Sequence, residues 1–138
     1  MLNSLFQGLT SLKTVEGNLE KMGYRTFYGC TSLEQVELGG LYSGNMGMEV
    51  FMNCTSLKKF VCSYGNGRLP TSTFAGCTAL ESVYFYNYTS FEDGIFDPVD
   101  RTDKIDHDYT QHVTFYVFKG SGAETQAKKN GIPYAYIE

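Results

Sequence analysis

The chain has 138 residues, of which 42% are hydrophobic, 15% are aromatic and only 3 are proline, which is enough to bury one continuous core. The formal net charge is −4 with a pI near 5.1, and Lys and Arg are scattered singly along the chain. No segment has the length and hydrophobicity of a membrane span, and no basic stripe could neutralise phosphates, so membrane insertion and nucleic-acid binding are excluded.

The phrase Phe-x-x-Cys-Thr-x-Leu occurs three times, at residues 27–33, 51–57 and 74–80. A degenerate copy at 6–12 carries Leu9 in place of Cys, and the Phe-to-Phe steps are 21, 24 and 23 residues. A fixed period of this length indicates one short structural unit per repeat, which must stack on copies of itself to bury its apolar face. The sequence therefore predicts a solenoid.

Each phrase leads into an alternating stretch that predicts a half-buried strand, such as Leu33-x-x-Val36-x-Leu38. One strand per turn predicts a parallel sheet. A second apolar position recurs five residues before each Phe, at Met22, Met46, Leu69 and Phe91. The period continues to Phe96, after which a polar insertion at 97–112 replaces the motif, and a strand resumes at 113–117.

The C-terminal segment predicts a short helix that closes the array. Ser121 and Glu124 form a capping box, the stretch 123–129 favours helix, and Asn130-Gly131 followed by Pro133 forms a stop. We expect a short strand to follow at Tyr134 to Ile137. The predicted domains are thus the solenoid at 1–118 and a cap at 119–138, which would cover the apolar end of the last turn.

These repeats resemble the BspA-like subclass of leucine-rich repeats, whose repeat reads approximately Phe-x-x-Cys-x-x-Leu-x-x-Val-x-Leu. The resemblance covers about residues 6 to 96 and departs from the pattern at Leu9 and over 97–112. It implies a β-rich solenoid of the α/β repeat class, a right-handed leucine-rich-repeat coil of about five turns. It also implies a noncatalytic bacterial cell-surface or secreted protein that contacts host proteins, extracellular matrix or other cells, without a cofactor.

The cysteines at the shared repeat position, Cys30, Cys54 and Cys77, are predicted to stack inward as a structural ladder. Leu9 in the same position favours packing over chemistry, and no pair has the close spacing of zinc ligands. Disulfides between neighbouring turns stay open as an alternative, because adjacent strands lie about 4.8 Å apart.

The insertion at 97–112 is the one segment that could bind a metal. It contains several acidic residues, with Asp103, Asp106 and Asp108 as the weak candidates for a divalent cation, but it lacks the spacing of a Ca²⁺ loop. We expect a solvated loop there, with neither a metal site nor catalytic residues.

The outward residues of the strands predict a binding face, because alternate side chains of a parallel sheet form rows across the turns. One row is predicted to be Thr14, Gln35, Lys59 and Ser82. The next is predicted to be Glu16, Glu37, Val61, Tyr84 and Thr114, and a third is predicted to end in Tyr86 and Tyr116.

The candidate binding residues on this face are Glu16, Glu37, Lys59, Tyr84, Tyr86 and Tyr116, so the face changes from acidic to aromatic. Exposed tyrosines favour recognition of a protein or a glycan, although Tyr also covers sheets merely because of its strand propensity. A binding module and a rigid spacer that displays another domain therefore both remain open, as does a glycan-binding module.

The N-terminal turn lacks a cap in this sequence, so we expect the chain to be a fragment of a longer array. An exposed parallel edge could then allow end-to-end self-association through residues 1 to 20.

Overall fold

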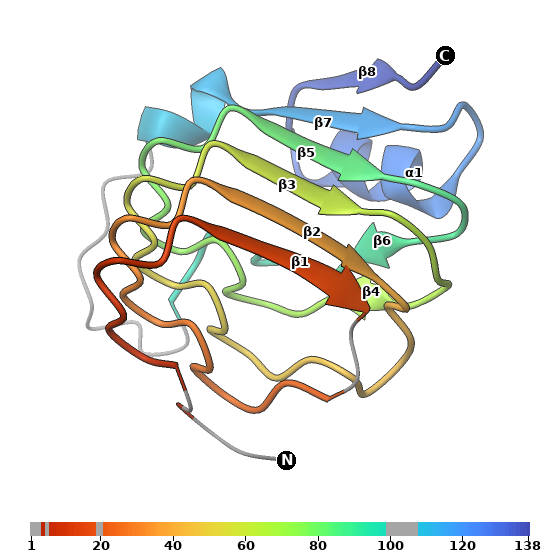
Figure 1. Cartoon of the computed structure of the whole chain (residues 1–138). Coiled ribbons are helices and arrows are strands. Elements are labelled where there is room, and N and C mark those ends of the chain that lie inside the picture. The colour runs from red at the N-terminus through yellow and green to blue at the C-terminus, as the bar shows by residue number, and fades with distance from the viewer. Residues whose placement is uncertain (1–3, 5, 19–20, 99–107) are drawn as a thin grey trace.

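The computed structural model describes residues 4, 6–18, 21–98 and 108–138 and confirms the predicted solenoid of about five turns (Figure 1). Its main feature is a six-stranded parallel sheet with the order β1-β2-β3-β5-β7-β8. The strands are β1 (Thr14–Asn18), β2 (Gln35–Gly39), β3 (Lys59–Cys62), β5 (Ser82–Phe85), β7 (Thr114–Val117) and β8 (Tyr134–Tyr136).

A second, interrupted strip of pairing runs through the other half of the turns. β4 (Arg68–Leu69) pairs in parallel with β6 (Ser90–Phe91), and Met22 forms an isolated parallel bridge with Met46. These contacts place Met22 beside Met46 and Leu69 beside Phe91, which are the apolar residues that precede each repeat Phe by five positions. The loose periodicity of the sequence there therefore corresponds to real pairing between turns.

The repeat phenylalanines stack along the core. The ring centroids of Phe6 and Phe27 are 5.3 Å apart, and those of Phe27 and Phe51 are 5.4 Å apart with an interplanar angle of 3°. Phe60 then interleaves, with edge contacts of 5.1 Å to Phe51 and 5.0 Å to Phe74. Rings of successive turns are thus in contact along the core, and each turn needs its neighbours to bury its apolar face.

The three motif cysteines are completely buried, and each makes a hydrogen bond to the preceding turn. The thiol of Cys30 donates to the carbonyl oxygen of Phe6 at 3.3 Å, that of Cys54 to Phe27 at 3.2 Å and that of Cys77 to Phe51 at 3.1 Å. All four cysteines, Cys62 included, are free thiols, so the structure shows no disulfide. The cysteine position therefore links consecutive turns as well as filling space.

The backbone is left-handed at two positions around the repeat Phe, one before it and one after it. The position two residues after it is glycine in most turns, and Gly76 has φ 76°. A Cβ there would also lie 2.0 Å from Asn53 Oδ1 of the preceding turn. The position two residues before it carries residues with side chains, namely Ser4, Arg25, Glu49 and Ser72, and then Gly94. These bends turn the chain sharply enough to bury Phe.

The helix α1 (Gly122–Lys129) follows β7 and packs against β6 and β7. Ser121 is its N-cap and accepts a hydrogen bond from Glu124 N at 3.1 Å, while Glu124 Oε1 accepts one from Gly120 N at 2.9 Å. Asn130 ends the helix, and the chain then returns as β8 beside β7. The predicted capping helix is confirmed, and the strand after it extends the main sheet.

Asp93 ties α1 to the turn that follows β6. One carboxylate oxygen accepts hydrogen bonds from Gln126 at 3.2 Å and Asn130 at 3.1 Å, and the other forms an ion pair with Lys129 at 2.9 Å. These bonds lower the pKa of Asp93 to about 2. A single exposed carboxylate thus binds three polar side chains at the C-terminal end of α1.

The first turn is more open than the others. Phe6 and Leu9 are 42% and 45% exposed, whereas the corresponding Phe51 and Cys54 are fully buried. The possible end-to-end association through this turn stays a prediction. Of the polar insertion, residues 99–107 lie outside the described part, and Asp108–His112 form the 3₁₀ helix η1.

Replacing a cysteine with serine should distinguish a buried thiol that donates a hydrogen bond from one that does not. In Cys54→Ser the hydroxyl can donate to the Phe27 carbonyl, so we expect a loss of about 1 kcal/mol or less in the free energy of unfolding. Cys62 has no hydrogen-bond partner among the described residues, so Cys62→Ser should cost about 1–3 kcal/mol. Urea unfolding of both variants measures this, and an equal loss would contradict the role of the thiol bonds.

Acid should loosen the helix through Asp93. Because the pKa of this carboxyl falls from an ordinary 3.8 to about 2 in the folded state, its stabilising effect is present above about pH 4 and is lost as the pH falls toward 2. We expect the midpoint of thermal unfolding of the wild type to exceed that of Asp93→Asn at pH 6 and to approach it near pH 2. A difference that does not change with pH would contradict this assignment.

Candidate binding face on the parallel sheet

The strand register fixes which outward side chains are neighbours. The first row is Thr14, Gln35, Lys59, Ser82 and Thr114, and the second is Glu16, Glu37, Val61, Tyr84 and Tyr116. The predicted placement of Thr114 beside Tyr84 was therefore wrong, as was the pairing of Tyr86 with Tyr116. The alternation of inward and outward side chains is the same in two registers that differ by two residues. The polar insertion also replaces the Phe-x-x-Cys-Thr-x-Leu motif before β7, and this motif marks the register in the other turns.

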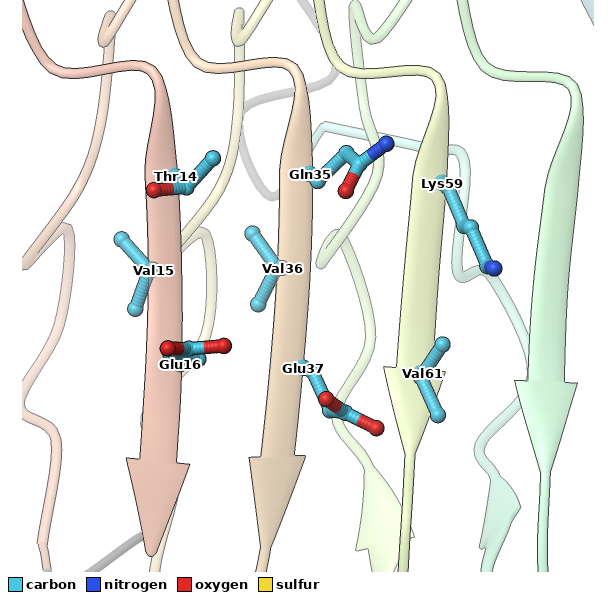
Figure 2. A pocket seen from close by; sticks show the side chains of 8 residues that line it. All are labelled: Thr14, Val15, Glu16, Gln35, Val36, Glu37, Lys59 and Val61. Carbon is cyan, nitrogen blue, oxygen red and sulfur yellow. The ribbon is translucent and has the colours of Figure 1, made fainter.

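The acidic half of the face lies on β1 and β2. Glu16 and Glu37 are exposed register partners on adjacent strands, and both project from the outward side of the sheet (Figure 2). Lys59 on β3 is also exposed, but it leans away from Glu37 toward β5. Its Nζ lies 5.3 Å from the centroid of the Tyr84 ring, which is a cation–π contact.

Two adjoining hollows cross this face. One has a volume of about 180 Å³ and is lined by residues of β1, β2 and β3. The other has a volume of about 440 Å³ and extends to Tyr84 and Tyr86. They share Glu37, Lys59 and Val61, and Val61 is only 8% exposed although it belongs to an outward row. The hollows therefore form one shallow trough, with Val61 in its floor.

The aromatic half consists of four rings in contact. Tyr84 stacks on Tyr116 with centroids 4.4 Å apart and an interplanar angle of 8°, and it lies 6.2 Å from Tyr86. Tyr86 makes an edge contact with Phe118 at 6.0 Å. These rings are half-buried. We call Tyr84, Tyr86, Tyr116 and Phe118 the aromatic cluster.

Phe118 was missing from the predicted site. It lies two residues beyond Tyr116, in the same outward phase, so continuing the alternation past the end of β7 would have found it. Phe118 also lines a separate hollow of about 430 Å³ together with Tyr88, which is 83% exposed. The aromatic surface thus continues beyond the sheet toward the start of α1.

The hydroxyl of Tyr84 carries no charge near neutral pH. Partial desolvation raises the pKa of Tyr84 above its usual value of 10.0, and the neighbouring Tyr116 and Tyr86 raise it further. An uncharged phenol can both donate and accept a hydrogen bond. The cluster therefore offers ring edges and hydroxyl groups to a partner.

A second group of charged and aromatic residues lies outside the sheet and is satisfied internally. Glu49 is fully buried and forms an ion pair with Arg25, at 3.0 Å between Oε1 and Nε. The Arg25 guanidinium lies 5.0 Å from the ring centroid of Tyr24 and 4.4 Å from that of Tyr28. This arrangement joins two turns at their left-handed positions, which gives it a structural role.

The candidate metal ligands of the insertion fall outside the described side chains. Asp103 and Asp106 lie outside the described residues, and Asp108 begins η1, but its side chain is not described. Among the residues that the structure describes, no group of three or more His, Cys, Asp or Glu side chains could hold a metal ion.

Comparison with known families agrees with the repeat geometry. The sequence pattern of the BspA type Leucine rich repeat region matches residues 2–123 in six copies. The chain belongs to this family. Its members are associated with bacterial surface and secreted proteins and are typically noncatalytic, which indicates a repeat protein of the protein-interaction or adhesion type.

No curated protein and no solved structure matches the chain significantly. In the described ranges, none of the helices combines the length and the apolar character required to cross a membrane.

Proposed function

We propose that this BspA-type domain is a noncatalytic protein-binding or adhesion module of a bacterial cell-surface or secreted protein. It contacts host or extracellular matrix proteins through the outward face of its six-stranded sheet. The residues proposed to bind are Glu16, Glu37, Lys59, Tyr84, Tyr86 and Tyr116, together with Phe118.

The observation that carries this proposal is the aromatic cluster. Its rings form an unbroken series of contacts across β5 and β7 on the outward side of the sheet. Rigid aromatic side chains provide contact area at a low cost in conformational entropy, which is why they are enriched where proteins bind one another. Because the rings already hold each other in place, little order has to be gained on binding.

The packing of the rings favours a protein ligand over a glycan. One face of Tyr84 is covered by Tyr116 at 4.4 Å, and the Lys59 ammonium group also lies over the ring, 5.3 Å from its centroid. A sugar that stacks on an aromatic residue needs an open ring face. The cluster instead presents edges and hydroxyls, which suit polar and edge-to-face contacts with protein groups.

The buried thiols support a noncatalytic role. Burial raises the pKa of Cys54 to about 12, and it also raises the pKa of Cys62 and Cys77. A nucleophilic cysteine needs an accessible thiolate, so these side chains are suited to holding the turns together.

Replacing the three tyrosines tests the proposed face. We expect the wild-type domain to show saturable binding to at least one member of a panel of extracellular matrix proteins and mucins, measured by surface plasmon resonance. The triple variant Tyr84→Ser, Tyr86→Ser, Tyr116→Ser should lose this binding, because it removes most of the contact area of the cluster.

The matched control is Tyr42→Ser, which removes a 47% exposed tyrosine that lies outside the main sheet and should bind as the wild type does. Circular dichroism should show that all variants keep their strand signal, since the rings lie outside the inner core. Binding that survives in the triple variant would reject the face, and the absence of any binding by the wild type would favour a rigid spacer.

A further inference from the structure

Two rows of charged residues cross the sheet, and they are ordered differently. Immediately before β1, β2, β3 and β5, consecutive turns carry Lys13, Glu34, Lys58 and Glu81. Backbone hydrogen bonds place them side by side, with Glu34 N to Lys13 O at 2.8 Å, Lys58 N to Glu34 O at 2.9 Å and Glu81 N to Lys58 O at 2.9 Å. We call this set the alternating row, because each charge has neighbours of the opposite sign, which is the favourable order across strands.

The second charged row has the unfavourable order. Glu16 and Glu37 are like charges on register partners, and like charges directly opposite each other destabilise a sheet. None of the ion pairs between described residues includes either carboxylate. The nearest lysine of the face, Lys59, is directed to the Tyr84 ring, as Figure 2 and the 5.3 Å contact show. The face therefore keeps an uncompensated pair of negative charges next to the trough.

The trough joins this acidic pair to the aromatic cluster. It runs across the strands from Glu16 over Glu37 and Val61 to Tyr84 and Tyr86. From the midpoint of β1 and β2 to the midpoint of β5 and β7 there are three strand spacings, which is about 14 Å at about 4.8 Å per spacing. An extended peptide covers this distance with about four residues at about 3.3 Å each.

We propose that the partner segment is an extended, basic stretch of a protein that lies across the strands. Its Lys or Arg side chains contact Glu16 and Glu37, and an aromatic side chain about four residues away contacts the edges of the aromatic cluster. This inference rests on the proposed function and adds the chemistry of the partner to it. The formal charge of −4 on the whole chain attracts such a segment at long range.

Selection from a library of random 12-residue peptides on the intact domain tests this chemistry. We expect the enriched peptides to contain at least two Lys or Arg residues and an aromatic residue about four positions away. Their binding should weaken as the salt concentration rises from 50 to 500 mM, because exposed charges are screened.

Two double variants separate the acidic pair from net charge. Glu16→Gln, Glu37→Gln should weaken binding of an enriched peptide by about tenfold, since two charge contacts are lost. Glu34→Gln, Glu81→Gln in the alternating row removes the same net charge and should leave the affinity within about twofold of the wild type, because charge contributes to affinity mainly through local contacts.

Three results would overturn the inference: enriched peptides without a basic preference, equal losses in both double variants, or no enriched peptide. Peptides that lack basic residues but lose binding in the triple tyrosine variant would reject only the basic partner and leave the binding face intact. Peptides that are insensitive to the tyrosine substitutions as well would reject both the basic partner and the proposed face.

Discussion

Burial of each repeat phenylalanine by the neighbouring turn is the constraint on which the structure depends. Phe51 is fully buried, and its ring lies 5.4 Å from that of Phe27 in the preceding turn. On its other side Phe60 of the same turn lies 5.1 Å away and bridges to Phe74 of the next turn at 5.0 Å. Since no turn can cover its own apolar face, the turns must stack at a fixed register. The thiol of Cys54 reinforces this register by donating to the preceding turn.

The binding face is a consequence of the same register. Once the inward residues are stacked, every outward residue has defined neighbours on the adjacent strands. Tyr84 therefore lies beside Tyr116, and Glu16 beside Glu37, because the stacking of the inward residues sets the register of the strands. A rigid core thus presents acidic and aromatic groups at a set separation, which lowers the entropic cost of binding an extended partner.

The sequence predicted the solenoid, the strands and the capping helix, because Phe, Cys and Leu recur at positions whose burial is obligatory. It predicted the wrong neighbours for Thr114 and Tyr116, since the polar insertion separates β7 from the last complete motif. The sequence did not reveal the hydrogen bonds of the thiols. The spacing of the cysteines is the same whether they only fill space in the core or also donate a hydrogen bond. The left-handed backbone at Arg25 and Glu49 had no sequence signal, as neither residue is typical of that conformation.

Hydroxyl-radical footprinting of the domain bound to a captured protein or peptide would show whether the outward face of the sheet is the binding surface. We expect Tyr84, Tyr86 and Tyr116 to become protected from oxidation, while Tyr24 and Tyr42, which lie outside the main sheet, remain as reactive as in the free domain. Protection of Tyr24 and Tyr42 without protection of the aromatic cluster would contradict it.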